Sequence, residues 1–231
     1  MIVNVSTDNY PLFLPAPKTP RSVGTHVSSI IRCIATEAGI LKADWAEELS
    51  LVDVRTITDL TAILRISIGL AIEQYYIPEI LSMYGVEDHP KELHYDGVYM
   101  THDGEDESVI ITLDESFKKI HSLTKRVHEV KATYKSTKTV GDLESQWMWL
   151  AQMKAYCIAV GTRFAVMHCW FLCGDYSYPI RPQRVVWEIE FTQDELDNNW
   201  TLLADYKRDF EAMLALEEAH KLSQGLNKWL E

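Results

Sequence analysis

The spacing of apolar residues predicts that helices come first along this chain. Apolar residues recur at helical intervals over residues 25–38, where Gly39 provides a stop, and again over about 56–84. In the second stretch we expect a kink at Pro78 and an end at Gly85. Two helical regions therefore precede the first strand.

From residue 93 onward the pattern changes to the alternation of half-buried strands. We expect a hairpin in which strands 93–100 and 108–113 are joined through the Asp-Gly step of HDGED, residues 102–106. Residues 115–125 are polar and are interpreted as a short helix or an insertion. The next strand is expected over 126–133.

A helix and two further strands follow before the C-terminal helix. Residues 145–161 are strongly helical, residues 163–173 are apolar like a buried strand, and residues 184–191 alternate like another strand. A long helix is expected from Thr192 to at least Leu222. This order predicts an α/β (α+β mixed) fold, with a central mixed sheet flanked by helices.

The domain organisation predicted from this pattern is simple. Four prolines within the first twenty residues indicate an extended N-terminal arm, which we place at residues 1–22. We see no linker or repeat after it, and a chain of 231 residues with 47% hydrophobic composition can bury one sizeable core. Residues 23–231 are therefore predicted to form a single domain, with the N-terminal helices and the long C-terminal helix included.

Composition further predicts a cytoplasmic protein without a membrane partner. The start of the chain lacks the basic, apolar and small-residue pattern of a secretory signal, and the apolar stretches are interrupted or too short for a bilayer. The four cysteines fit a reducing compartment, because a chain of this length needs no disulfide bonds.

Charge is unevenly distributed along the sequence. The formal net charge of −12 argues against a nonspecific nucleic-acid coat protein. Residues 118–138, however, contain seven lysines and arginines against one acid, whereas residues 188–231 contain eleven acids against four bases. The basic block contains Glu129 and Lys131, which point to the same face if the strand 126–133 forms. Either these two charges form an ordinary exposed ion pair, or they belong to a site that needs a carboxylate beside an ammonium.

Three polar positions from neighbouring predicted elements favour the second interpretation. Asp96 lies at the end of a strand-like run before Gly97, and Gln152 and Tyr156 are four residues apart on the helix that follows Lys131. Two carboxylates from adjacent strands can bind a divalent cation through oxygen, and an ammonium beside them can orient water or stabilise charge on a phosphate.

The series Asp96, Glu129-Val130-Lys131 and Gln152-x-x-x-Tyr156 resembles the PD-(D/E)XK nuclease superfamily, in the branch of lambda-type exonuclease and the RecB-like nucleases. Gly69-x-x-x-Glu73 resembles the G-x-x-x-(E/H) element of that branch. The resemblance covers about residues 60–200, and His94-Tyr95 departs from it where the family often has a proline before the aspartate.

The resemblance implies a restriction-endonuclease-like core and a role for each matching residue. Asp96 and Glu129 would bind Mg²⁺ or Mn²⁺, with the Val130 carbonyl and Glu73 as further ligands. Lys131 would activate or position the attacking water, and two residues of the following helix would support the site and the bound strand. The supporting residues there are Gln152 and Tyr156.

The implied activity is that of a metal-dependent deoxyribonuclease, and specifically an exonuclease acting on duplex ends in recombination or replication, in a phage or a bacterium. An endonuclease of the same fold and an inactive DNA-binding or structural module remain as alternatives. A homo-oligomer and a single-strand annealing or recombination protein are expected as partners besides DNA.

Basic and hydroxyl side chains around the strand are candidates for phosphate contacts, because lysine and arginine dominate affinity for DNA. Arg32 is included because its placement resembles that of an arginine contacting the DNA end in lambda-type exonuclease. The predicted DNA-binding residues are Arg32, Lys125, Arg126, Thr133, Lys135, Ser136 and Lys138.

Overall fold

The computed structural model describes residues 22, 24–41, 67–69, 71–86, 91–113, 119–140 and 143–227. Most of the predicted arm at residues 1–22 lies outside these residues. The part of the predicted helical region 56–84 that precedes residue 67 also lies outside them. The division into an arm and a single domain therefore stays a prediction.

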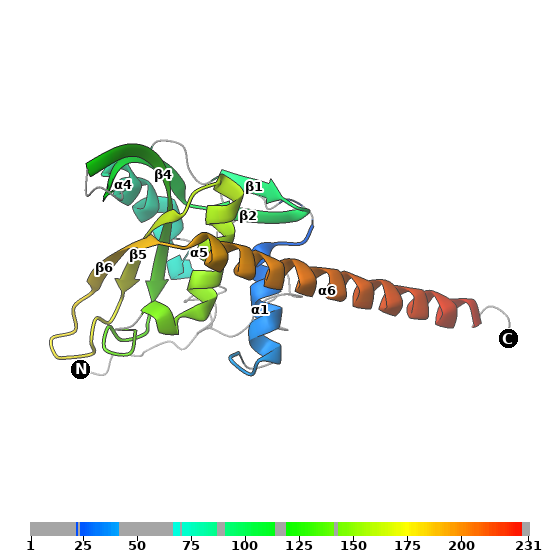
Figure 1. Ribbon diagram of the computed structural model, residues 1–231. Coiled ribbons are helices and arrows are strands. Elements are labelled where there is room, and N and C mark those ends of the chain that lie inside the picture. The colour runs from blue at the N-terminus through cyan, green and yellow to red at the C-terminus, as the bar shows by residue number, and fades with distance from the viewer. Residues whose placement is uncertain are drawn as a thin grey trace, which may run out of the picture.

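The centre of the fold is a four-stranded mixed sheet (Figure 1). Its strands are β3 (Gly104–Leu113), β4 (Lys119–Thr133), β5 (Phe164–Phe171) and β6 (Gln183–Glu190), in that spatial order. Only β4 and β5 are parallel, and α5 (Trp147–Val160) makes the crossover that a parallel pair requires. The predicted mixed α/β fold is confirmed, and so is the helix expected over 145–161.

The two faces of the sheet are covered by different helices. On one face Val127 of β4 packs with Ala151 and Tyr156 of α5 in the main core. On the other face Val130 packs with Ile80 and Leu81 of α4 (Ile77–Ser82). The alternation of a strand thus sends neighbouring residues of β4 into two separate apolar clusters.

The helix α4 continues a short π-helical segment, η2 (Ile72–Tyr76). Pro78 lies in the first turn of α4, directly after the change from π-helix to α-helix. The helix gives way to a turn that includes Gly85, close to the predicted end.

The predicted hairpin between 93–100 and 108–113 is wrong. Strand β1 (Lys91–Tyr95) instead pairs with β2 (Val98–His102) in a separate two-stranded sheet. The turn is the other Asp-Gly step, because Asp96 has φ 47° and Gly97 has φ 72°, and a two-residue type I′ turn needs positive φ at both positions. The step at 103–104 lies where the chain passes from one sheet to the other.

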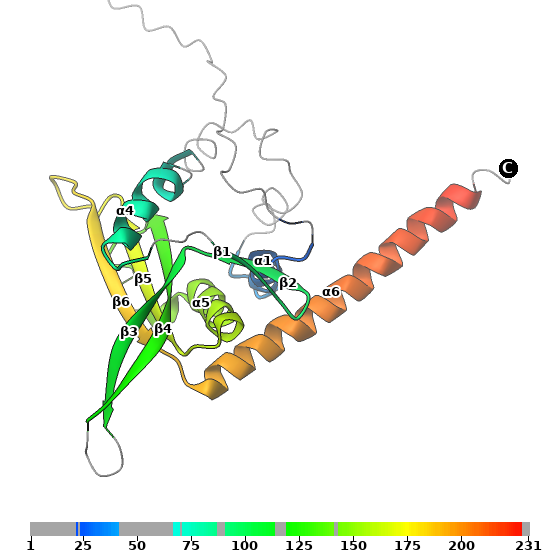
Figure 2. The ribbon, with the colours of Figure 1, turned by 90° about the horizontal axis from the view of Figure 1, so that it is seen from above.

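The interpretation of residues 115–125 as a helix or insertion is also corrected. Residues 119–125 belong to β4, which pairs with β3 from Gly104↔His128 to Leu113↔Lys119. Strand β5 begins opposite Arg126, so the earlier part of β4 and its partner form a two-stranded arm that projects from the sheet (Figure 2). Both faces of the arm's described part carry exposed residues, and such a ribbon shows no apolar alternation.

Two further helices pack beside α5. The predicted first helix is α1 (Val27–Glu37), which contributes Ile30 and Ile31 to the main core. The C-terminal helix α6 (Gln193–Asn227) begins after a capping box in which the Glu195 carboxylate accepts the Thr192 N–H at 2.9 Å. In both views α6 extends well beyond the sheet (Figures 1 and 2). Within the described ranges, no helix has the length and apolar character needed to cross a bilayer.

Candidate active site

Glu129 and Lys131 lie side by side on the face of β4 that α5 covers. The Lys131 ammonium donates to Glu129 Oε1 and, at 2.9 Å, to Gln152 Oε1. The Gln152 amide in turn donates to the Tyr156 hydroxyl. The structure therefore brings four of the predicted site residues into one connected group.

This group is not an ordinary surface ion pair. Glu129 is 5% exposed, and the side chain of Lys131 is 22% exposed. Burying a carboxylate and an ammonium costs several kcal/mol each before their mutual attraction and hydrogen bonds are counted. The expectation of solvated charges on an exposed strand face is therefore excluded, and a role that needs both charges becomes the better explanation.

A second carboxylate reaches this group from the chain segment before β3. Asp103 Oδ2 accepts the backbone N–H of Val130 at 2.5 Å, and the Asp103 N–H donates to the carbonyl of His128 at 3.2 Å. The register of β3 with β4 ends at the pair Gly104↔His128, and Asp103 is the residue just before that pair. Its carboxylate therefore lies at the backbone of Val130, the neighbour of Glu129 in the chain.

Asp96, the aspartate predicted for this position, lies elsewhere. It sits exposed in the turn between β1 and β2, where its Oδ2 is 3.4 Å from Trp200 Nε1 and its carbonyl accepts from Lys207 at 3.3 Å. Its described contacts are thus with α6, and the structure does not bring it to Glu129. Asp103, which the sequence interpretation did not include, lies beside this group instead.

The sequence pattern did not identify Asp103, because Asp96 and Asp103 each precede a glycine and either Asp-Gly step could form the hairpin turn. Once the pairing of β3 with β4 is known, the position of Asp103 follows from counting back along the hairpin. That pairing was not available from the sequence pattern, in which β4 seemed to start at residue 126.

The oxygen donors at this point fit a small hard cation. Asp103 and Glu129 supply two carboxylates, and the Val130 carbonyl points to the same side of β4 as the Val130 N–H, which faces Asp103. Mg²⁺ is usually bound by one or two carboxylates and keeps its other positions for water and phosphate. Among the described residues no group of three or more His, Cys, Asp or Glu side chains could hold a metal, so backbone and solvent would complete the set.

Glu73, the further predicted ligand, belongs to η2. The helix that continues η2 packs on Val130, from the face opposite Glu129. The Glu73 side chain lies outside the described part of the structure, so its role stays a prediction.

The predicted DNA-binding residues do not form one surface. Arg126 points to the other face of the sheet, where its side chain is 13% exposed and forms ion pairs with Asp106 at 2.5 Å and Glu188 at 3.3 Å. This corrects its assignment as a phosphate ligand. Lys125 is exposed and lies 3.6 Å from Glu105, but it is six residues, or about 20 Å, before Lys131 along the strand.

The remaining candidates cluster at the opposite end of β4. Lys135 and Lys138 are exposed there, and the hydroxyls of Thr133 and Ser136 accept their backbone N–H groups at 3.1 and 3.2 Å. These two hydroxyls shape the turn and keep their own O–H free to donate. Arg32 is half-buried on α1, and its contact with DNA stays a prediction.

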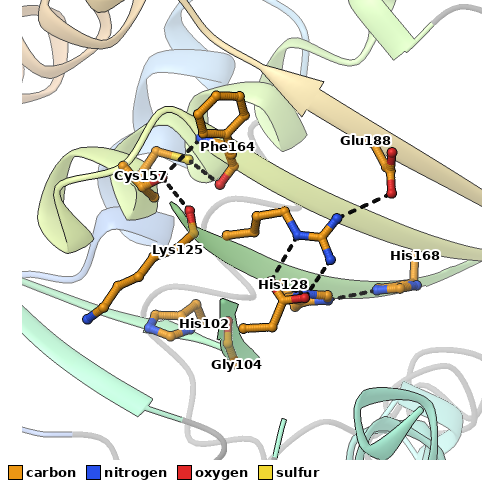
Figure 3. A network of polar contacts seen from close by, with 11 residues as sticks. His102, Gly104, Lys125, His128, Cys157, Phe164, His168 and Glu188 are labelled. Atoms are coloured by element: carbon orange, nitrogen blue, oxygen red, sulfur yellow. Dashed lines mark hydrogen bonds and ion pairs between the residues drawn. The ribbon is translucent and has the colours of Figure 1, made fainter. Parts of the chain in front are cut away.

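A buried polar chain crosses the sheet on the face opposite Glu129, and Figure 3 shows its central contact between His128 and His168. Asp106 of β3 contacts His128 of β4 at 3.3 Å, and His128 Nδ1 lies 3.1 Å from His168 Nε2 of β5. Arg184 of β6 donates to His168 Nδ1 at 2.9 Å. If His168 accepts at Nδ1, its Nε2 carries the proton that His128 Nδ1 accepts. This arrangement connects a carboxylate to a guanidinium through two neutral imidazoles and joins all four strands.

Both imidazoles are fully buried, and Tyr84 packs against each of them. Burial, followed by the charges of His128 and Arg184, lowers the pKa of His168 to about 3. Burial also lowers the pKa of His128, against the opposing effect of Asp106. The buried surroundings therefore favour the neutral form of both imidazole rings.

We expect the two buried histidines to make the metal-free protein less stable in mild acid. The unfolded His168 binds a proton below pH 6.5, whereas the folded one resists it down to about pH 3, so its stabilising effect is complete above pH 6.5 and lost as the pH falls. The free energy of unfolding should decrease by about 2 kcal/mol between pH 7.5 and pH 5 from this group. Urea unfolding with a chelator at several pH values measures it. His168→Gln should flatten the profile, and an equal slope in the variant would contradict the assignment.

Comparison with known proteins gives similarity in structure only. No protein-family model matches the sequence, and no curated protein matches it. Among solved structures, the exonuclease LHK-Exo in complex with dAMP is 13% identical, with a TM-score of 0.48 over 86% of this chain and 94% of that one. A second structure, of this alkaline exonuclease from Laribacter hongkongensis, is 11% identical with a TM-score of 0.46 over the same shares.

A phage-related exonuclease from Haemophilus somnus is 13% identical, with a TM-score of 0.46 over 86% of this chain and 97% of that one. Because the identities are so low and the TM-scores are below 0.5, these similarities do not determine the chemistry of this chain. The functional argument therefore rests on the residues around Glu129 and Lys131.

Proposed function

We propose that this protein is a metal-dependent deoxyribonuclease that hydrolyses phosphodiester bonds, with duplex ends as its substrate. The observation that carries the proposal is the Asp103 carboxylate held at the Val130 N–H, one residue along β4 from Glu129, with the Lys131 ammonium held beside Glu129. The preference for ends is supported by the sequence resemblance to the lambda-type branch.

The proposed ligands of Mg²⁺ or Mn²⁺ are Asp103, Glu129 and the Val130 carbonyl. Such an ion, when bound, lowers the pKa of coordinated water and stabilises negative charge on phosphate oxygens. The cation preference follows from an all-oxygen ligand set on rigid strands.

The proposed role of Lys131 is to stabilise negative charge that develops on the phosphate. Its ammonium is held by Glu129 and Gln152, so it is already oriented before a phosphate arrives. A preorganised cation stabilises charge that develops on a phosphate oxygen without having to reorganise first. Tyr156 fixes the Gln152 amide and is thereby a positioning residue.

Digestion of linear and covalently closed circular duplex DNA tests the function. Purified protein is incubated with each DNA in Mg²⁺, in Mn²⁺ and in chelator, with Glu129→Gln as the inactive control. Metal-dependent loss of the linear DNA alone is expected. Nicking of the circle would support an endonuclease of the same fold, and no cleavage of either DNA would support the inactive binding module.

Lys135 should contribute to DNA affinity more than Lys125 does. Lys135 is at the end of β4 near Lys131, whereas Lys125 is on the projecting arm and near Glu105. Removing one phosphate contact should reduce the slope of log affinity against log salt by about 0.7 to 0.9. The affinity of Lys135→Ala and Lys125→Ala for labelled DNA is measured in chelator at several salt concentrations. An unchanged slope in Lys135→Ala would remove this lysine from the interface.

A further inference from the structure

Two loops meet at the edge of the sheet where β4 and β5 end. Residues 134–139 follow β4, and residues 172–182 connect β5 to β6. The Thr137 N–H donates to the Gly174 carbonyl at 3.0 Å, so the two loops lie side by side at the lower left of Figure 1. Since β4 and β5 are parallel, this is the edge toward which the chain runs from Glu129.

The loops expose aromatic rings on an anchored backbone. Tyr178 is 97% exposed and Tyr176 is 54% exposed. The Tyr176 hydroxyl donates to the Tyr134 carbonyl, which ties the second loop to the first. The Asp175 carboxylate accepts the Ser177 N–H at 2.9 Å and its hydroxyl at 2.8 Å, so the segment before Tyr178 is held in a turn. The rings therefore face water although their backbone is fixed.

Two lysines lie on the first of the two loops. Lys138 is exposed and lies 3.1 Å from Asp175. Lys135 donates to Gln146 Oε1 at 2.7 Å, and its ammonium is 5.3 Å from the centre of the Trp149 ring. Both of these partners are uncharged, so they orient the ammonium without neutralising it.

The same helix that orients Lys135 also orients Lys131. Trp149 and Gln152 are three residues apart on α5 and so lie on one side of the helix. Trp149 contacts Lys135, and Gln152 accepts from Lys131. The two lysines are four residues apart, or about 13 Å if the chain stays extended. The loops thus begin within a few nucleotides' reach of the candidate active site.

We propose that residues 134–139 and 174–180 form a surface on which the bases of single-stranded DNA stack beside the active site. Unpaired bases offer free faces to tyrosine rings, whereas the bases of a duplex already stack on each other. Phosphates between the stacked bases would meet Lys135 and Lys138. This inference rests on the proposed function and adds a substrate feature to it, namely an unpaired strand next to the scissile bond.

The test is the affinity for a short fluorescein-labelled oligothymidylate in chelator, measured by fluorescence anisotropy. Tyr178→Ala should weaken binding roughly tenfold, which is the usual effect of losing one stacked base. Tyr178→Trp should retain binding because it keeps a ring. Tyr95→Ala is the control, since Tyr95 packs on Trp200 at the β1–β2 turn.

Two further DNA probes separate stacking from phosphate contact. A blunt duplex should bind the wild type and Tyr178→Ala within about twofold of each other, because its bases are unavailable. An abasic strand of the same length should bind the wild type as weakly as the thymidylate binds the variant. The inference would be overturned if Tyr178→Ala lost the same affinity for the thymidylate and for the abasic strand, or lost no affinity for either.

The outcome is independent of cleavage because binding is measured without metal. Base-dependent binding through Tyr178 together with no cleavage of any DNA would remove the proposed nuclease function and keep the stacking surface. Metal-dependent cleavage together with unchanged binding by Tyr178→Ala would remove the stacking surface and keep the nuclease.

Discussion

Asp103→Asn is expected to reduce metal-dependent DNA cleavage on the order of 10³-fold, whereas Asp96→Asn should leave it within about twofold. Asparagine keeps an oxygen that can accept the Val130 N–H, so the strand geometry should survive while one negative ligand is lost. At position 96, asparagine tolerates the positive φ of 47° that the turn requires. The two variants remove the same charge from two places.

Initial rates on linear duplex DNA and calorimetric titration with Mn²⁺ measure this pair of variants. Asp103→Asn should also lose the strongest Mn²⁺ binding. If Asp96→Asn instead lost activity and metal binding while Asp103→Asn retained both, the site would have to be rebuilt around the β1–β2 turn.

Lys131→Ala should reduce turnover by about 10²- to 10³-fold and keep the fold. The variant removes the ammonium that contacts Glu129, so more negative charge is left near the proposed metal ligands. We therefore expect Mn²⁺ to bind this variant at least as tightly as it binds the wild type, because the cation no longer competes with a lysine.

Rates and Mn²⁺ titrations of Lys131→Ala are compared with those of Lys125→Ala, a lysine of the same strand that is distant from the site. Circular dichroism verifies that both variants are folded. Wild-type turnover in Lys131→Ala would contradict its catalytic role, and weaker Mn²⁺ binding would contradict the expected competition.

The basic block shows why a charge count along a strand predicts a surface poorly. Arg126 and Lys125 are adjacent in sequence, yet Arg126 is half-buried and forms ion pairs with Asp106 and Glu188, whereas Lys125 is exposed on the arm. A strand sends successive side chains to opposite faces and advances about 3.3 Å per residue. The basic residues of this block that lie on β4 are therefore spread along the strand and over its two faces.

The polar chain behind the sheet was equally hidden from the sequence. Asp106, His128, His168 and Arg184 come from four different strands, and each alone resembles an ordinary surface residue. Their contacts depend on strand order and register, which are set by long-range pairing rather than by local pattern.

Local pattern was sufficient for the mixed α/β fold, for α1, α5 and the start of α6, and for placing Glu129 and Lys131 on one face. Helical spacing, glycine stops and a capping box act within a few residues, and so does strand alternation. The four residues between Gln152 and Tyr156 likewise fix their proximity on α5.

Tertiary structure alone decided which aspartate lies near Glu129. Both Asp96 and Asp103 precede glycine, and either step could have formed the tight turn. The choice depended on the pairing of β3 with the full length of β4, which involves residues up to 24 positions apart and cannot be read from neighbouring residues. Register therefore assigned Asp96 to the turn at α6 and Asp103 to the candidate metal site.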